Sequence, residues 1–308
     1  MPATVDRVAD LGFDGQVAIV TGAGGGLGRE HALLLASRGA RVLVNDLGGS
    51  VHGDGSDLGP AEAVATAIRD LGGEAVADGH SVATPEGGES IVGAALEAFG
   101  RVDIVVNNAG ILRDKAFHNL TPELLDPVID VHLRGAFHVT RPAWVKMREQ
   151  GYGRVVNTSS NSGILGNFGQ SNYGAAKMGL VGLTRVLAAE GAKYGIKVNA
   201  IAPLARTRMT EELLGEAAEA LDPSLVSPVV AFLAHESVPV TGEVYTVGGG
   251  RVARFFVGMT TGFTSRELTV EQVRDHFTQI RDETGYSVPA GPADELRALM
   301  DALGQTRA

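Results

Sequence analysis

The chain has 308 residues, of which 44% are hydrophobic, and this is enough to bury a full core in one large domain or two small ones. It contains no cysteine, which excludes disulfides, thiolate catalysis and cysteine-ligated metal sites. A formal net charge of −10 argues against a nucleic-acid-binding surface, and no apolar run approaches the ~18 residues that a membrane span needs.

Short β-branched runs alternate with stretches of helical spacing along most of the chain. We predict strands at residues 16–22, 41–46, 74–78, 103–110, 154–160, 197–203 and 243–249. We predict helices near residues 26–38, 60–71, 86–99, 121–149, 171–193 and 224–235. The strands are almost continuously apolar, as strands buried on both faces are. The pattern therefore predicts an α/β fold: a Rossmann-type doubly wound, mostly parallel seven-stranded sheet with helices on both faces and a short helical C-terminal extension.

The last part of the chain lies beyond the final predicted strand. In it, Thr269 and Gln272 form a capping-box pattern, and residues 292–303 have the spacing of a second amphipathic helix. Two short helices seldom fold alone. We therefore expect a main domain over residues 1–250 and a helical tail over residues 251–308 that packs on it.

The glycine-rich stretch "TGAGGGLGRE" follows the first predicted strand and opens the first helix. Gly22, Gly26 and Gly28 allow a tight turn and a close approach of a pyrophosphate to the free N–H groups of the helix. A tight turn without a ligand would carry the same glycines. Asp46, however, ends the second strand, where a carboxylate can hydrogen-bond an adenosine ribose. The two features together predict a dinucleotide-binding site in the main domain.

Asp46 also bears on the choice of nicotinamide cofactor. Its carboxylate would repel a 2′-phosphate, and residues 23–26 (Ala, Gly, Gly, Gly) provide no cation to offset the repulsion. We therefore predict NAD over NADP. The glycine-rich residues 47–59 that follow predict a surface loop before a helix.

Tyr173 and Lys177 lie four residues apart in a predicted helix, so their side chains share one face. An ammonium near a phenol favours the phenolate and would lower the tyrosine pKa, which would make the phenol a usable acid and base. Ser160 ends a strand upstream, at the edge of the sheet that faces the ligand crevice, and could hold a substrate oxygen. An ordinary amphipathic helix is the alternative interpretation of the Tyr-Lys spacing.

The glycine loop, "NNAG" (107–110), Ser160 and Tyr173-x-x-x-Lys177, in this order and spacing, resemble the short-chain dehydrogenase/reductase family. The resemblance covers about residues 13–250. Within the family it is closest to the (3R)-hydroxyacyl-CoA dehydrogenase units of peroxisomal multifunctional enzymes of type 2 and their bacterial relatives. The stretches that carry it are "TGAGGGLGR", "VNDLGG", "VNNAGILRDKAF", "VHLRGAFHVTRPAW", "TSSNSGILGNFGQSNYGAAK", "IAPLARTRMT" and "FLAHES".

The resemblance implies a role for each site residue. Tyr173 would be the general acid and base, Ser160 would position the carbonyl, and Lys177 would hold the nicotinamide ribose and lower the tyrosine pKa. Asp46 would bind the adenosine ribose of NAD. The other implied cofactor-binding residues are Gly22, Gly26, Leu27, Gly28, Asn107, Ala109, Gly110 and Thr207.

Three positions depart from the wider family. His132 in "VHLRG" replaces an asparagine that supports a proton-relaying water, although the closest branch also carries histidine there. Leu204 replaces a glycine after the sixth strand, so this loop cannot use positive φ cheaply. At the end of the third strand, His80 occupies the position of a frequent adenine-binding aspartate, and Asp78 is the alternative contact.

The leading functional hypothesis is an NAD-dependent oxidoreductase that transfers a hydride between the cofactor and a 3-hydroxyacyl-CoA. A hydroxysteroid or steroid-CoA dehydrogenase is the second, and a non-catalytic NAD(H)-binding scaffold is the third. If the substrate is a CoA thioester, the candidate phosphate-binding residues are Arg113, Lys115, Arg206 and Arg208.

Partners and location follow from the same pattern. The long helices at 121–149 and 171–193 are apolar on more than one face, and members of the resembled family pair them into dimers or tetramers. We expect no nucleic-acid or membrane partner, and no metal, because the histidines lack metal-ligand spacing. A separate enoyl-CoA hydratase would supply any coupled hydration. The start "MPATVDRVADLGF" has no signal-peptide pattern and the end "QTRA" is no peroxisomal tripeptide, so a cytoplasmic location is expected.

Overall fold

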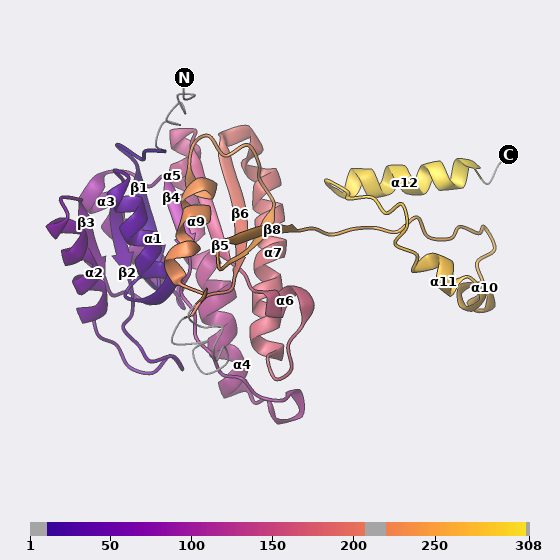
Figure 1. The fold of residues 1–308 in the computed structure, drawn as a ribbon, viewed down its shortest axis with the longest axis horizontal. Helices are drawn as coiled ribbons and strands as arrows, with labels where there is room; N and C mark the ends of the chain where they lie inside the picture. The colour runs from indigo at the N-terminus through magenta and orange to yellow at the C-terminus, as the bar shows by residue number, and fades with distance from the viewer. Residues whose placement is uncertain (1–10, 207–219, 306–308) are drawn as a thin grey trace, which may run out of the picture. The chain divides into compact units, whose positions relative to one another are not determined.

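The structure is a computed structural model in which residues 11–206 and 220–305 are described. The chain divides into two compact units, Met1–Arg254 and Phe255–Ala308. In the first unit, one sheet has the strand order β3-β2-β1-β4-β5-β6-β7-β8 (Figure 1). Its strands are β1 (Val17–Thr21), β2 (Arg41–Asn45), β3 (Ala75–Asp78), β4 (Ile104–Asn107), β5 (Gly153–Thr158), β6 (Ile196–Pro203), β7 (Val244–Gly248) and β8 (Arg251–Phe255). Neighbouring strands from β3 through β7 pair in parallel, which confirms the predicted doubly wound sheet.

Within residues 11–206 and 220–305 the sheet has eight strands, one more than the seven predicted, and the additional strand is β8. This strand follows β7 after Gly249 and Gly250, whose φ angles are 56° and 77°. A two-residue turn with both φ angles positive matches the twist of a hairpin, so the chain reverses and adds a strand at the sheet edge. We predict residues 251–255 as part of the helical tail, whereas the structure places them in β8.

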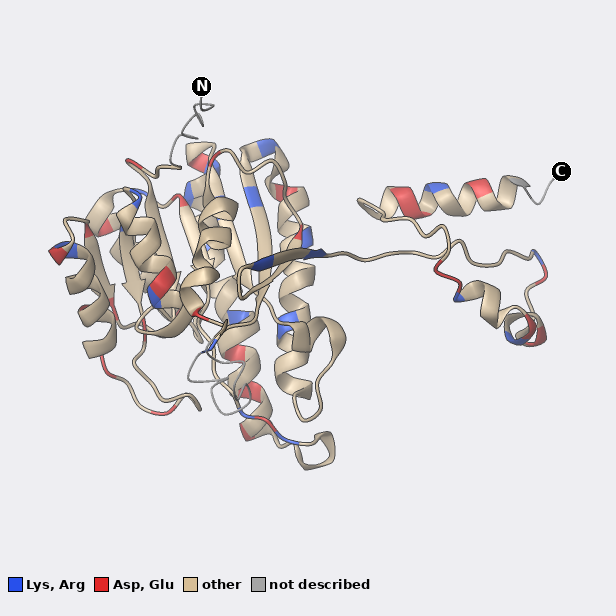
Figure 2. Ribbon diagram, in the orientation of Figure 1, with Lys and Arg blue, Asp and Glu red and all other residues tan. Residues whose placement is uncertain are grey.

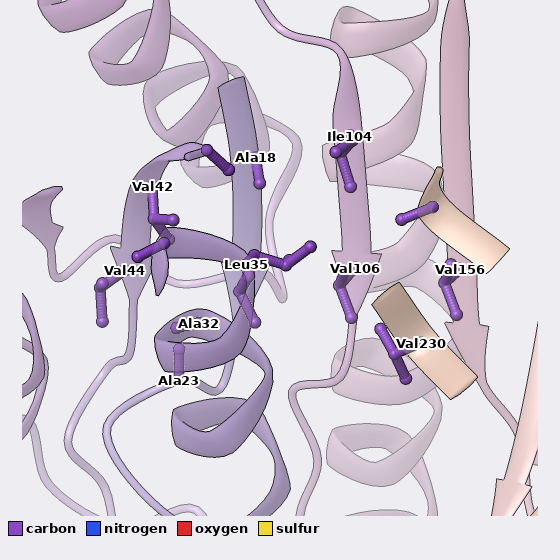
Figure 3. Packing of buried hydrophobic residues seen from close by; sticks show 14 of the residues in the cluster. Ala18, Ala23, Ala32, Leu35, Val42, Val44, Ile104, Val106, Val156 and Val230 are labelled. Atoms are coloured by element: carbon purple, nitrogen blue, oxygen red, sulfur yellow. The ribbon is translucent and has the colours of Figure 1, made fainter. Parts of the chain in front are cut away.

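Helices cover both faces of the sheet. They are α1 (Gly26–Ser37), α2 (Gly59–Asp70), α3 (Pro85–Phe99), α4 (Pro122–Ile129), α5 (Gly135–Gln150), α6 (Asn161–Leu165), α7 (Ser171–Gly191) and α9 (Ser227–Ala234), with short turns η1 (Phe117–Asn119), η3 (Ala192–Tyr194) and η5 (Pro223–Leu225). Alternate residues of the strands point to opposite faces. Ala18 and Val20 pack with α1, α2 and α9, and Figure 3 shows Ala18 on the same side as Leu35 of α1 and Val230 of α9. Val17 and Ile19 pack with α3, α5 and α7. Both faces are thus buried, as the continuous apolar runs predicted.

The single helix predicted over residues 121–149 is interrupted in the structure. The helix α4 is followed by η2 (Asp130–Arg134), one turn of π-helix, and then by α5. A π turn inserts one extra residue into the helical ladder and is frequent at functional sites. Here it contains His132, which lies at the candidate site described below.

The second unit contains α10 (Val270–Asp275), α11 (Phe277–Ile280) and α12 (Pro292–Gln305). The capping box at Thr269 and Gln272 is confirmed, since each residue's backbone N–H donates to the other's side chain at 3.2 Å. The first turn of α12 contains the acidic residues Asp294 and Glu295, whose charge complements the helix dipole; Figure 2 shows acidic positions in red on this helix. That this unit packs on the first stays a prediction.

Within the described ranges, no helix combines the length and apolar character that crossing a membrane requires.

His31 on α1 is a buried histidine at the contact with α9. Its Nδ1 lies 2.8 Å from Ser227 Oγ, and its Nε2 is buried without a hydrogen-bond partner. Burial lowers the pKa of His31 from 6.5 to about 3. The folded state therefore disfavours the proton that the unfolded chain binds below pH 6.5, so stability falls as the pH drops from 6.5 towards 3.

We predict that this histidine costs about 2 kcal/mol of the free energy of unfolding between pH 7 and pH 5. Urea unfolding at both pH values should show that loss in the wild type and a smaller one in His31→Gln. His118→Gln, at an exposed site, controls for the loss of an imidazole. Equal pH slopes for the wild type and His31→Gln would contradict the prediction.

Candidate active site

A cavity of about 570 Å³ opens at the carboxyl ends of the central strands. Residues that follow β1, β2, β4 and β5 line it, among them Gly22, Asp46, Asn108 and Ser160. The order of the sheet reverses between β1 and β4, and ligands of doubly wound sheets bind at such a switch point. The volume is in the range of small-molecule and cofactor sites.

The glycine loop between β1 and α1 forms one wall. Gly22 and Gly26 have φ angles of 64° and 51° and line the cavity together with Leu27. Gly28 does not line it, which corrects the expectation of a pyrophosphate contact. A Cβ at Gly28 would lie 2.2 Å from the carbonyl oxygen of Gly22, so this glycine permits the close packing of α1 on the loop.

Asp46 also lines the cavity and holds the glycine loop. One carboxylate oxygen accepts a hydrogen bond from the Gly24 N–H at 2.8 Å, and the other accepts from the Gly48 N–H at 2.7 Å. Each oxygen keeps a second lone pair for a hydroxyl group. The glycine wall and this carboxylate therefore fit the pyrophosphate and ribose of a dinucleotide.

Of the two residues left open at the end of β3, His80 faces the cavity and Asp78 does not. Asp78 is buried, and its carboxylate accepts from Asn45 Nδ2 at 2.7 Å and lies 2.8 Å from His80 Nδ1. Because an ionised carboxylate only accepts, Asp78 selects the histidine tautomer with a proton on Nδ1.

The segment after β4 also needs one correction. Ala109 and Gly110 line the cavity as expected, but Asn107 lies behind it. Asn107 Nδ2 donates to Thr140 Oγ1 and to Asn157 Oδ1, both at 2.8 Å, in a buried polar network. Asn107 therefore holds the strands and α5 together, and its neighbour Asn108 is the residue that reaches the cavity.

Ser160, Tyr173 and Lys177 converge on the same cavity. The Ser160 side chain acts on the Tyr173 phenol in the direction that lowers its pKa. Lys177 Nζ lies 5.5 Å from the centre of the Tyr173 ring and donates to the carbonyl oxygen of Thr158 at 2.5 Å. The positions are set by the end of β5 for Ser160 and by adjacent turns of α7 for the other two.

The direction of the tyrosine pKa shift differs from the expectation. Burial raises the pKa of Tyr173, a nearby Asp114 carboxylate adds to the rise, and the Ser160 hydrogen bond opposes it. Burial also lowers the pKa of Lys177 to about 7, so the ammonium itself is disfavoured. Desolvation outweighs the charge pairing that the helical spacing suggested. A neutral phenol in this position is suited to donating a proton to a carbonyl oxygen.

His132 packs edge-to-face on Tyr173, with ring centres 5.1 Å apart. Its Nε2 lies 2.8 Å from the carbonyl oxygen and 3.0 Å from the amide nitrogen of Ile111, and its Nδ1 is buried without a partner. Burial, with the Lys177 charge, lowers the pKa of His132 well below 6.5, so the ring is neutral. A second cavity of about 10 Å³, room for about one water, is lined by His132, Lys177 and Asn107.

Residues 47–59 form more than the predicted surface loop, because Leu47, Ser50 and Val51 line the cavity. The Leu112 N–H donates to the Val51 carbonyl at 3.0 Å. Glycine content signalled a loop here, but nothing in the sequence indicated what the loop covers.

Four further predicted positions can be compared with the structure one by one. Arg113 donates to the carbonyl oxygens of His52 at 2.9 Å and Glu123 at 2.8 Å, so it joins chain segments where a phosphate contact had been expected. Leu204 lines the cavity with ordinary backbone, since no described non-glycine residue has positive φ. Thr207 and Arg208 lie outside the described residues. Across residues 11–206 and 220–305, no group of three or more histidine and carboxylate side chains is arranged to hold a metal.

The sequence and structure match known proteins over most of the chain. The chain is 51% identical over 279 residues to the short-chain type dehydrogenase/reductase Rv0148 of Mycobacterium tuberculosis, covering 90% of this chain and 98% of that protein. It is 38% identical over 299 residues to the hydroxyacyl-CoA dehydrogenase ChsB1 of the same organism, covering 89% and 92%.

Peroxisomal multifunctional enzyme type 2 is a third relative. The mouse protein is 48% identical over 298 residues, which are 95% of this chain but 40% of the mouse chain. The structure of the full-length enzyme from Drosophila melanogaster matches with a TM-score of 0.80 and 37% identity, covering 96% of this chain and 50% of that one. The chain thus spans about half the length of these multifunctional relatives, or less.

A family model described as short chain dehydrogenase matches residues 16–217. This range holds the glycine wall, Asp46 and the Ser160, Tyr173 and Lys177 cluster. Members of the family use a nicotinamide cofactor, and the dinucleotide-shaped wall of the cavity fits one. The chain therefore belongs to the short-chain dehydrogenase family and is an oxidoreductase acting on CH–OH groups.

Proposed function

We propose that the chain is an NAD-dependent dehydrogenase that interconverts a 3-hydroxyacyl-CoA and the corresponding 3-oxoacyl-CoA. The observation that carries the proposal is the convergence of Ser160, Tyr173 and Lys177 on a cavity that Asp46 also lines. The name of the relative ChsB1, a hydroxyacyl-CoA dehydrogenase, supports the substrate class. The uncompensated carboxylate of Asp46 supports NAD over NADP.

In this proposal the residues of the chain divide the work of the reaction. A bound nicotinamide would accept or donate the hydride. Ser160 would donate a hydrogen bond to the substrate oxygen, and Tyr173 would transfer the proton to or from it. Lys177, with a pKa of about 7, would carry that proton onward at neutral pH. The second cavity beside His132 gives room for a water on this route.

A substrate panel tests the proposal. CoA thioesters of 3-hydroxy acids and free steroid alcohols are assayed with NAD and with NADP, by following absorbance of the reduced cofactor. We expect the highest kcat/KM for a 3-hydroxyacyl-CoA with NAD. A higher kcat/KM for a steroid alcohol would show that the substrate is a steroid and not a CoA thioester. If no compound is turned over, a non-catalytic binding protein would be favoured.

We also propose a homodimer or homotetramer formed through α5 and α7. Large apolar side chains on both helices are exposed in the single chain: Phe137 and Val145 on α5, and Met178 and Val186 on α7. Such faces are often subunit interfaces. Light scattering after size exclusion would reveal a monomer if this is wrong. A cytoplasmic location, packing of residues 255–308 on the first unit and a separate hydratase partner remain part of the proposal.

A further inference from the structure

Three polar side chains near Tyr173 form a chain of hydrogen bonds, and two of them are amides that have no role in the proton chemistry described above. Gln170 precedes α7 and is buried, and its Nε2 donates to Asp114 Oδ2 at 2.6 Å. Its Oε1 accepts from Asn167 Nδ2 at 3.0 Å. Asn167 and Gln170 line the large cavity, whereas Asp114 does not.

The carboxylate fixes the orientation of both amides. Ionised Asp114 can only accept hydrogen bonds, so Gln170 must turn its NH₂ group towards it and its oxygen towards Asn167. Asn167 must then present its own NH₂ group to that oxygen. Each amide nitrogen keeps a second hydrogen, and the cavity wall is therefore supplied with oriented donors.

The position of these donors matches a second oxygen of the substrate. Gln170 is the N-cap residue of α7, three residues before Tyr173, and both side chains line the cavity. Asn167, Gln170 and Tyr173 all line the same cavity, so the two amides and the reacting phenol face one space. In a 3-hydroxyacyl thioester, one CH₂ group separates the reacting carbon from a carbonyl, whose oxygen only accepts.

We propose that Asn167 and Gln170 bind the thioester carbonyl of the substrate and that Asp114 orients them from behind the cavity wall. The inference rests on the proposed function and adds the residues that select a β-hydroxy thioester over a simple secondary alcohol. Asp114 is a positioning residue, because it orients Gln170 by a hydrogen bond and does not itself line the cavity.

The test compares two matched substrates. One is the N-acetylcysteamine thioester of 3-hydroxybutyrate, and the other is the thioether in which CH₂ replaces the carbonyl. The wild type should prefer the thioester about tenfold in kcat/KM, a typical effect of one hydrogen bond. Asn167→Ala should bring the ratio of the two kcat/KM values close to one. The exposed Ser171→Ala, beside the site but outside the cavity wall, should leave the ratio unchanged.

Substitutions of Asp114 test whether the two amides must be oriented or need only be present in the cavity wall. Asp114→Asn can donate to Gln170 and turn both amides over, which would present oxygens to the cavity, so the ratio should fall as in Asn167→Ala. Asp114→Glu keeps the acceptor and should restore much of the preference. Changes in Tyr173 caused by the lost charge affect both substrates and cancel in the ratio.

A second measurement does not depend on turnover. The side-chain amide NMR signals of Asn167 and Gln170, assigned by loss in Asn167→Ala and Gln170→Ala, should shift on binding of the acetoacetyl thioester and not of its thioether analogue. Equal ratios in the wild type and Asn167→Ala, with unshifted amide signals, would overturn the inference. If both substrates react, the proposed function survives that result; if neither reacts nor binds, both proposals fail.

Discussion

Tyr173→Phe should lower kcat for 3-hydroxyacyl-CoA oxidation by about 10²- to 10⁴-fold, the range that positioned acid–base groups contribute. The phenol lines the cavity together with Ser160 and Lys177, so its hydroxyl is the group placed to exchange a proton with the substrate oxygen. Phenylalanine preserves the ring that packs on His132. Stopped-flow or steady-state absorbance of NADH measures the loss.

Binding of NADH separates this chemical effect from a collapsed site. Its Kd, measured by fluorescence, should change by less than about threefold in Tyr173→Phe, because the ring and the glycine wall remain. Tyr194→Phe removes the phenol of a half-buried tyrosine, which accepts from Arg148 at 2.7 Å outside the cavity, and serves as the matched control. Unchanged turnover in Tyr173→Phe with every responsive substrate would remove the basis of the proposed chemistry.

The fold could be predicted where burial dictates the residue type. Every residue of β1 is buried, and its apolar run predicted the strand to within one residue at each end. The strand β8 was missed because it lies at the edge of the sheet, is largely exposed and carries two arginines, so it lacks that signal. The turn before β8 could have been predicted, because two consecutive glycines between β-rich runs are a hairpin pattern.

The site could be predicted where one strand end or one helix fixes the side chain. Asp46, Ser160, Tyr173 and Lys177 belong to that class, and all four line the cavity. Asn107 does not, because the side of a strand end that faces the cavity depends on the pleat. It lies on the same face of β4 as Val105, which packs against the α5 layer.

The direction of the Tyr173 pKa shift could not be predicted from the sequence, for a different reason. Helical spacing predicts that Lys177 is near, but the sign of the shift depends on how deeply both groups are buried. Likewise, the sequence positions of Asn167, Gln170 and Asp114 do not indicate that hydrogen bonds connect their side chains. Asp114 comes from the segment after β4, and only the folded chain brings it to Gln170.

Asp46→Asn should reduce the preference for NAD over NADP by about 100-fold in kcat/KM. A unit charge about 6 Å from a phosphate charge contributes about 3 kcal/mol at an effective dielectric constant of about 20, and each 1.4 kcal/mol is tenfold. The substitution removes this repulsion while keeping the shape of the side chain. Kinetics with both cofactors at saturating 3-hydroxyacyl-CoA measure the ratio.

The same substitution also disturbs the glycine loop, and the two effects must be told apart. Both carboxylate oxygens accept backbone N–H groups, from Gly24 and Gly48, and an asparagine can accept only one of them. Loss of that hydrogen bond should raise KM for both cofactors alike, whereas loss of repulsion should lower KM for NADP alone. Asp57→Asn, a carboxylate of the same loop outside the cavity wall, controls for the change in net charge. If the ratio falls only because KM for NAD rises, with KM for NADP unchanged or higher, Asp46 does not select NAD by charge.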